Sequence, residues 1–247
     1  MNYDGLQTTY WNGQIARVEK LRARIGEFDG PSIGRVVPLD DDLAIGEGRR
    51  LSVAVMFLDI SSFSQRPSET EAEQDLQLRV LSLFFSEMIK IAEDYGGTVE
   101  KNTGDGLMAY FESADGENGS KRAVSCALTM MAANECLIRP ILQATPAPEI
   151  SFRISIDHGW VTIARLGAAR RFNANVAIGS TANFAAKMLS FAKAGDIVIG
   201  ESAKNQLPSQ WQISFTELFT RETGWSYRAT GRSYPLYRYT GRWAKLI

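Results

Sequence analysis

Apolar residues along this chain fall into two kinds of pattern, short continuous runs and spacings of three or four residues. Such runs are typical of strands, and such spacings are typical of one face of a helix. The runs predict strands at residues 51–60 and 196–200, a hairpin at 98–112 and a pair of strands at 150–167. The spacings predict helices at residues 70–95, 120–138 and 180–194. Helices interleaved with strands in this order indicate a sheet covered by helices.

The first fifty residues have a different character and are expected to form an appendage. Four apolar residues near the start recur at helical spacing: Ile15, Val18, Leu21 and Ile25. They predict a helix over residues 9–25, after which residues 26–48 are typical of a linker. We therefore expect an N-terminal helix and linker over residues 1–50 and one larger domain over residues 51–247.

Charge and composition argue against several classes of function. The formal net charge of -1 provides no basic field for nucleic acid. No apolar run approaches membrane-spanning length, and the first residues lack the features of an export signal. Cys126 and Cys136 have no metal-type spacing and are expected to be reduced thiols. The sequence thus favours a cytoplasmic protein that binds neither nucleic acid nor a membrane.

Asp59 stands at the end of an otherwise apolar run and needs a partner, because an ionised carboxylate taken out of water is costly. One candidate is the chain itself, since Asp is a favoured N-cap and residues 60–64 could open a helix. A second acid, Asp105, lies in the Gly-flanked turn of the predicted hairpin, which is also a common plain turn.

Two acids beside one cleft would suit Mg2+, which binds through one or two carboxylates and takes its other ligands from water and substrate phosphates. The residues that follow Asp59 would then offer free amides at a helix N-terminus, which is a place suited to phosphate oxygens. The pattern therefore suggests a site for a metal and a phosphate-bearing substrate.

Two segments, MFLDISSF (56–63) and KNTGDGLMAYF (101–111), resemble the two metal-binding motifs of the class III nucleotidyl cyclases, the adenylate and guanylate cyclase family. Three further segments are similar to later parts of that family, at residues 152–167, 172–188 and 231–239. The resemblance implies an α+β fold, with a ferredoxin-like, palm-type and mainly antiparallel sheet covered by helices. It also makes residues 51–247 the catalytic domain.

The resemblance assigns chemistry to the two motifs. Asp59, Ile60 and Asp105 would hold two Mg2+ or Mn2+ ions. The substrate would be contacted by four consecutive residues, Ile60, Ser61, Ser62 and Phe63. The 3'-hydroxyl of a nucleoside triphosphate would attack its own α-phosphate and release pyrophosphate, which leaves a 3',5'-cyclic nucleotide.

Three further positions match residues that contact the substrate in the family. Lys101 matches the lysine that recognises the base, and Asn183 matches the asparagine that positions the ribose. Lys187 lies four residues after Asn183, hence on the same helix face, and stands where the family has its transition-state arginine. An ammonium lacks the forked geometry of a guanidinium, so either Lys187 suffices or Arg170 or Arg171 takes part.

Base choice depends on Val176, which replaces the acidic or hydroxyl acceptor that adenylate cyclases direct at the adenine amino group. Valine accepts no hydrogen bond, and losing a built-in bond can cost about 1 to 3 kcal/mol of discrimination. With Lys101 as a donor, the best-matched base is uracil. The chain resembles in this respect the bacterial pyrimidine cyclases of antiphage defence (the Pycsar type), which make cyclic UMP or cyclic CMP, and we expect UTP to be favoured over CTP.

Two other interpretations stay open. One is an adenylate cyclase that uses other acceptors, such as Asn173 or Asn175, and the other is an inactive cyclase-like module that binds nucleotide. For an active enzyme, the resemblance implies a head-to-tail homodimer with composite sites and a downstream effector that reads the cyclic nucleotide. The lone histidine, His158, lies beside Gly159 where a turn is expected, and is interpreted as a structural turn residue.

Overall fold

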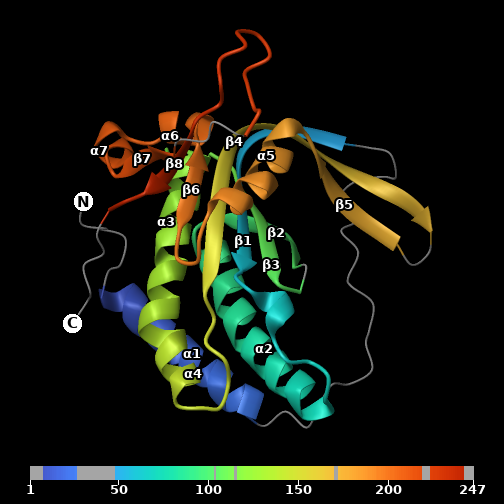
Figure 1. The fold of residues 1–247 in the computed structure, drawn as a ribbon, viewed down its shortest axis with the longest axis vertical. Coiled ribbons are helices and arrows are strands. Elements are labelled where there is room, and N and C mark those ends of the chain that lie inside the picture. The colour runs from blue at the N-terminus through green and yellow to red at the C-terminus, as the bar shows by residue number, and fades with distance from the viewer. Residues whose placement is uncertain are drawn as a thin grey trace.

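The computed structural model of the chain (Figure 1) describes residues 8–26, 48–102, 104–113, 116–169, 172–218 and 223–241. The strands are β1 (Gly48–Ile60), β2 (Gly97–Asn102), β3 (Gly106–Phe111), β4 (Phe152–Ala169), β5 (Phe172–Ile178), β6 (Ile197–Gly200), β7 (Phe215–Leu218) and β8 (Leu236–Tyr239). The helices are α1 (Thr8–Gly26), α2 (Glu71–Asp94), α3 (Gly119–Ala133), α4 (Arg139–Gln143), α5 (Ser180–Met188), α6 (Glu201–Asn205) and α7 (Ser209–Gln212).

The strands form one sheet in the order β2-β3-β1-β4-β6-β8-β7, and β5 pairs with β4 off this path. Among the described strands, every pairing is antiparallel except the parallel pairing of β4 with β6. The predicted α+β fold, a mainly antiparallel sheet covered by helices, is therefore confirmed. The longest pairing joins β1 to β4 over thirteen residues of β1 and sets the middle of the sheet.

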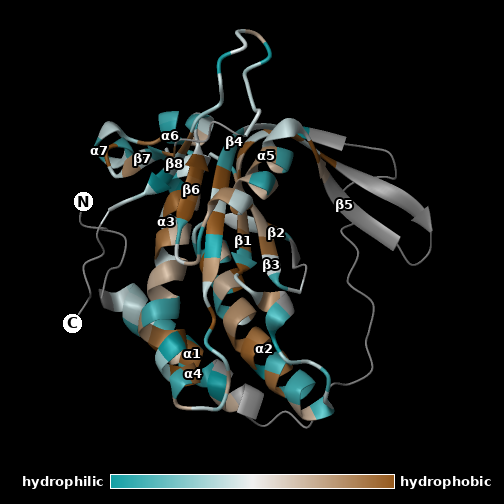
Figure 2. Cartoon of the chain, in the orientation of Figure 1, coloured by the Kyte–Doolittle hydropathy of each residue, from teal (hydrophilic) through white to brown (hydrophobic). Residues whose placement is uncertain are grey.

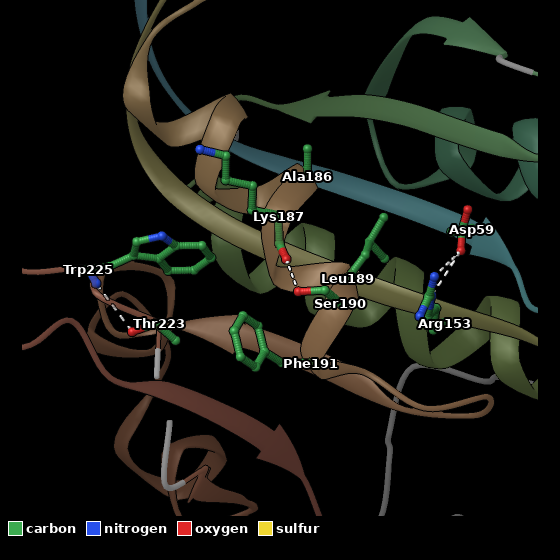
Figure 3. Close-up of a pocket in the computed structure, with 9 residues that line it drawn as sticks. All are labelled: Asp59, Arg153, Ala186, Lys187, Leu189, Ser190, Phe191, Thr223 and Trp225. Atoms are coloured by element: carbon green, nitrogen blue, oxygen red, sulfur yellow. Dashed lines mark hydrogen bonds and ion pairs between the residues drawn. The ribbon is translucent and has the colours of Figure 1, made fainter. Parts of the chain in front are cut away.

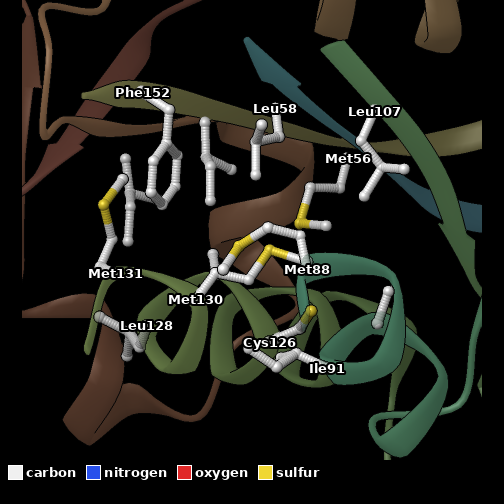
Figure 4. Packing of buried hydrophobic residues seen from close by; sticks show 14 of the residues in the cluster. Met56, Leu58, Met88, Ile91, Leu107, Cys126, Leu128, Met130, Met131 and Phe152 are labelled. Atoms are coloured by element: carbon white, nitrogen blue, oxygen red, sulfur yellow. The ribbon is translucent and has the colours of Figure 1, made fainter. Parts of the chain in front are cut away.

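The main core lies between the sheet and the helices α2 and α3 (Figure 1). Met56 and Leu58 of β1 and Met88 of α2 meet there, and all three are buried (Figure 4). Because side chains alternate along a strand, Val53 and Val55 point to the opposite face, where α5 covers them. Figure 2 shows the apolar residues gathered on the central strands and along α2 and α3. The sheet is thus apolar on both faces near its centre.

Helix α1 packs against α2. Its Val18 is buried in the main core, and its Gln14 and Arg17 both donate hydrogen bonds to the buried carboxylate of Glu87, at 3.3 Å and 3.2 Å. Burial raises the pKa of Glu87, while the nearby Arg17 guanidinium opposes that rise. The predicted helix is present and rests on the larger unit, whereas most of the predicted linker lies outside the described residues. The boundary between an appendage and a catalytic domain stays a prediction.

The expected turn at His158 and Gly159 is wrong. Residues 152–169 form one continuous strand, β4, in which His158 pairs with Ala54 of β1. A Cβ at position 159 would lie 2.5 Å from Oγ1 of Thr181, so the glycine lets α5 come close to the sheet. His158 is a strand residue, and burial lowers its pKa.

Three elements that were not predicted, α6, α7 and β7, follow β6. Further differences lie at the ends of predicted elements. The helix predicted at 120–138 runs as α3 and then as a π-helical turn, Asn134–Ile138. The helix predicted at 180–194 is shorter, because α5 gives way to a 3₁₀ turn at Leu189–Phe191. Over the residues that the structure describes, no helix has both the length and the apolar character needed to cross a bilayer.

Candidate active site

The partner of Asp59 in this structure is Arg153. The two residues are directly opposite each other in the antiparallel pair β1 and β4, where side chains of opposite charge meet. Nε and Nη2 of Arg153 both lie 2.8 Å from Oδ2 of Asp59 (Figure 3). The helical turn that follows Asp59, Phe63–Gln65, has Ser62 at its cap. Asp59 is therefore a strand residue with a cation beside it, and the N-cap interpretation does not hold.

Asp105 lies beside Asp59, at the start of the neighbouring strand. Gly106 pairs with Asp59 across β3 and β1, and the backbone N–H of Ile60 donates to the carbonyl of Asp105 at 2.8 Å. The two acids thus sit at the same end of adjacent strands. Both acids are half-buried, and the Asp59 side chain keeps a relative exposure of 24% with Arg153 against it.

These residues fit a divalent metal ion of the hard, oxygen-binding kind. Two carboxylates at neighbouring strand ends are what Mg2+ commonly takes from a protein, with water and phosphate completing its coordination. In the described part of the chain, no group of three or more His, Cys, Asp or Glu side chains is placed to hold a metal. An ion between Asp59 and Asp105 would therefore depend on oxygens from other sources, and it would share Asp59 with Arg153.

The expected row of free amides after Asp59 differs in the structure. The N–H of Ile60 bonds to Asp105, and the N–H of Ser61 bonds to the carbonyl of Ser151 at 2.8 Å. Ser62 adopts a left-handed conformation, with φ at 57°, and Phe63 opens a 3₁₀ turn rather than an α-helix. Two of the four amides are thus occupied by the sheet and its neighbouring loop, and a role for the segment in binding phosphate stays a prediction.

Asn183 and Lys187 both lie exposed on α5, four residues apart as predicted. The side chain of Lys187 extends away from Asp59 (Figure 3), while its carbonyl accepts a hydrogen bond from Ser190 at 2.8 Å. Within one chain, the structure therefore brings the helix near the acids without bringing the Lys187 ammonium to them.

The residues predicted to read the base are placed only by their backbones. Lys101 lies on β2 opposite Met108, and Val176 lies on β5 opposite Ala164. Their side chains lie outside the described part of the structure, as do those of Asn173 and Asn175. Arg170 and Arg171 lie outside the described residues altogether.

A pocket of about 500 Å³ runs from Asp59 toward the end of α5 (Figure 3). Nine residues line it: Asp59, Arg153, Ala186, Lys187, Leu189, Ser190, Phe191, Thr223 and Trp225. Sequence reasoning missed Arg153 and the two aromatic residues of the lining, Phe191 and Trp225. Alternation along β4 puts Arg153 on the face of the sheet that Asp59 also shares, but that signal can be read only when the pairing of the strands is known.

The family is decided by a match along most of the chain. Residues 47–223 match the family model described as the adenylate and guanylate cyclase catalytic domain. The chain belongs to this family. An adenylate cyclase of Anabaena cylindrica is 26% identical to this chain over 172 residues, which cover 68% of this chain and 33% of that protein. A uridylate cyclase of a Rhodovulum species is 25% identical over 175 residues, which cover 68% of this chain and 70% of that protein.

Solved structures of the cyclase family show the same fold. The adenylyl cyclase CyaB from P. aeruginosa has a TM-score of 0.63 at 26% identity, over 81% of this chain and 100% of that one. The guanylyl cyclase Cya2 has a TM-score of 0.65 at 18% identity, over 78% of this chain and 94% of that one. This chain thus spans nearly all of the solved catalytic units but only about a third of the Anabaena protein.

Proposed function

We propose that this chain is a nucleotidyl cyclase, which converts a nucleoside triphosphate to a 3',5'-cyclic nucleotide and pyrophosphate. The observation that carries the proposal is the placement of Asp59 and Asp105 at neighbouring strand ends, joined by the backbone hydrogen bond from Ile60 to Asp105. Membership of the cyclase family supports cyclisation of a nucleoside triphosphate as the reaction in which these two acids take part.

Mg2+ or Mn2+ bound at Asp59, Ile60 and Asp105 would lower the pKa of the attacking 3'-hydroxyl and neutralise charge on the phosphates. The protein supplies the rest. Arg153 places a guanidinium on the same face of the sheet as Asp59. Two of its N–H groups can bind two phosphate oxygens at once. Asn183 would orient the ribose, and Lys187 would meet charge that develops on the α-phosphate.

The proposal includes a homodimer with composite sites, and the geometry of α5 supports it. Asn183 and Lys187 are exposed, and Lys187 points away from the acids of its own chain. A second copy placed head to tail would present these residues to Asp59 and Asp105, and each dimer would then have two sites. We place Lys101 in the half of the site that α5 supplies.

The substrate that we favour is a pyrimidine nucleoside triphosphate, with UTP before CTP. Val176 accepts no hydrogen bond from a base amino group, whereas Lys101 can donate to a carbonyl. The likeness to a uridylate cyclase supports this choice, and the equally distant likeness to an adenylate cyclase supports ATP as the second candidate. A pyrimidine product would be a second messenger for an effector in antiphage defence.

The test is to incubate the purified chain with ATP, GTP, CTP and UTP, each with Mg2+ or Mn2+, and to identify the products by chromatography and mass spectrometry. Cyclic UMP as the main product supports the proposal. Cyclic AMP as the main product would replace the pyrimidine assignment by the adenylate one. No cyclic product from any of the four would leave an inactive nucleotide-binding module.

A further inference from the structure

Helix α5 carries Asn183 and Lys187, yet little within the helix itself holds it in place. It is nine residues long, and no side chain caps its first turn, where Gly179 stands. Helices this short are marginal in water, so their stability and direction come from packing against the rest of the protein. The contacts that α5 makes therefore decide where its exposed side chains point.

An aromatic cluster forms one of these contacts. The ring of Phe184, which follows Asn183, stacks on Trp225 with centroids 5.2 Å apart and an angle of 29° between planes. It also stacks on Tyr234, at 5.9 Å and 25°. Phe191, just beyond α5, meets the same Trp225 edge to face at 5.8 Å. Pairs of this kind stabilise a fold beyond the area that they bury, and their preferred geometry gives the contact a direction.

Tyr234 is held in place by hydrogen bonds to its hydroxyl group. Its hydroxyl donates to Oδ1 of the buried Asp157 on β4 at 2.6 Å and accepts from the N–H of Ser202 at 3.1 Å. Gly200 leaves room for this pair, because a Cβ there would collide with both Asp157 and Tyr234. The ring that supports Phe184 therefore has a set position relative to β4, the strand that also carries Arg153.

A second link ties α5 to the same strand. The hydroxyl of Ser155, which is buried on β4, donates to the carbonyl of Ala185 at 2.6 Å. This bond, the hydrogen bond from Thr181 to the carbonyl of Trp160 at 3.4 Å and the packing of Ala182 and Ala185 hold the inner face of the helix against the sheet. The stack on Phe184 adds a contact on another side of the helix and opposes a roll about its axis.

We propose that Trp225 and Tyr234 are positioning residues for turnover, which act on α5 through Phe184. They keep Asn183 and Lys187 at the angle at which these side chains meet the ribose and the α-phosphate. This inference rests on the proposed function. Trp225 also lines the pocket beside Asp59, whereas Phe184 does not. Because Asp59, Asp105 and Arg153 lie on the sheet and not on α5, loss of the stack through Phe184 lowers kcat and leaves KM for the nucleotide nearly unchanged.

The test compares Trp225→Leu with Trp225→Phe, which keeps an aromatic ring, and with Phe184→Leu, which removes the ring from the helix side. Tyr239→Leu is the matched control, because Tyr239 packs edge to face on Phe215 at 5.4 Å at the edge of the sheet and is not stacked on Phe184. We expect kcat to fall roughly tenfold or more in Trp225→Leu and Phe184→Leu, since misplacement of catalytic groups is read in kcat. KM should stay within about twofold in Phe184→Leu, which leaves the lining of the pocket intact. Trp225→Phe should recover most of the rate.

Hydrogen exchange gives a readout that does not depend on activity. Amides of residues 180–188 should exchange faster in Trp225→Leu than in wild type, while those of β1 stay protected, and Tyr239→Leu should show neither change. The inference is overturned if Trp225→Leu and Tyr239→Leu lower kcat alike, or if exchange in α5 is unchanged. If the wild-type chain cyclises no nucleotide, the proposed function fails by the activity assay. The hydrogen-exchange measurement still tests the positioning role of the aromatic stack, because unchanged exchange in α5 would overturn it without any assay of activity.

Discussion

Asp59 and Arg153 face each other directly across β1 and β4, and the guanidinium contacts a single oxygen of the carboxylate through two nitrogens. The acid that we propose as a metal ligand therefore has a cation at its side. A positive charge at this distance opposes the approach of a second cation. Metal binding at Asp59 should thus depend on the position of Arg153, and incoming phosphates would offer Arg153 another anion to bind.

Arg153→Gln is expected to raise the affinity of the nucleotide-free protein for Mn2+ by roughly tenfold, or about 1.4 kcal/mol, because it removes the competing charge. The same change should lower kcat/KM for the nucleotide, since the fork for phosphate is lost. Mn2+ titration followed by electron paramagnetic resonance measures the first effect. Arg238→Gln, which breaks an ion pair with Asp196 at 3.1 Å, is the control and should change neither quantity. Unchanged Mn2+ affinity in Arg153→Gln would contradict the linkage.

Asp105→Asn should lower cyclisation by roughly 100-fold or more, because the charge that it removes acts on charge developing in the transition state. The amide keeps the shape of the side chain, so the unfolding temperature should stay close to that of wild type. Asp59→Asn should have a similar effect, although it also leaves Arg153 without its partner. Asp75→Asn, at an exposed position on α2, is the control. Full activity in Asp105→Asn would remove it from the proposed site.

A mixture of Asp59→Asn and Asn183→Ala proteins tests the composite sites. Each variant should be inactive alone. After exchange of subunits, about a quarter of wild-type activity should return, because half of the dimers are mixed and each mixed dimer has one intact site. Exchange itself is checked by native mass spectrometry with one isotope-labelled partner. Demonstrated exchange without recovered activity would indicate a site within one chain.

Val176→Asp should move the substrate preference from UTP toward a nucleotide whose base carries an amino group. The carboxylate would gain a donor from such a base and would be left unpaired against uracil, a difference of roughly 1 to 3 kcal/mol in kcat/KM. Lys101→Ala should lower kcat/KM for UTP. Competition among the four triphosphates in one reaction measures both. An unchanged order of preference in Val176→Asp would exclude Val176 from base choice.

Asp157 gives the chain a specific dependence of stability on pH. Burial raises the pKa of this carboxyl from 3.8 to about 7, although hydrogen bonds from Tyr234 and from the N–H of His158 oppose the rise. Between these values the folded state keeps a proton that the unfolded state releases. The free energy of unfolding should therefore fall as pH rises from about 4 to about 7. The contribution of this one carboxyl to the slope should approach about 1.4 kcal/mol per pH unit.

Asp157→Asn keeps an acceptor for the Tyr234 hydroxyl and removes the titration. The difference in unfolding free energy between variant and wild type, from urea denaturation across this range, should grow in favour of the variant as pH rises. Parallel profiles for the two proteins would show that the carboxyl does not titrate in this window.

Local patterns in the sequence predicted most elements from β1 to β6 and the two acid-bearing segments, but they did not predict the single long strand β4 or the elements α6, α7 and β7. The glycine at position 159 shows where such patterns are ambiguous, since a glycine marks either a turn or a close approach of another element. Here Thr181 of α5 is the element that approaches, and it lies 22 residues further along the chain. Nothing near Gly159 in the sequence distinguishes the two cases.

The site was predictable in part for the same reason. Asp59 and Asp105 each lie in a recognisable local context, whereas Arg153 gains its meaning only from the residue opposite it. The amides of Ile60 and Ser61 looked free because the segment resembled the start of a helix, but the neighbouring strand and loop already bind them. The role of Arg153 and the partners of these two amides depend on pairing between residues far apart in the chain, which no local pattern encodes.

The pairing of β1 with β4 also bears on how the chain folds. Asp59 and Arg153 are 94 positions apart in the chain, and the hairpin with Asp105 and the helices α2 and α3 lie between them. Contacts between such distant residues form slowly, because a long loop must close before any stabilising contact is gained. A slip of one residue in this pairing would turn one of the two strands over and separate the acid from the guanidinium. Newly synthesised chains should therefore acquire helices early and the candidate site late, and a partly folded chain should not yet bring Asp59 and Arg153 together.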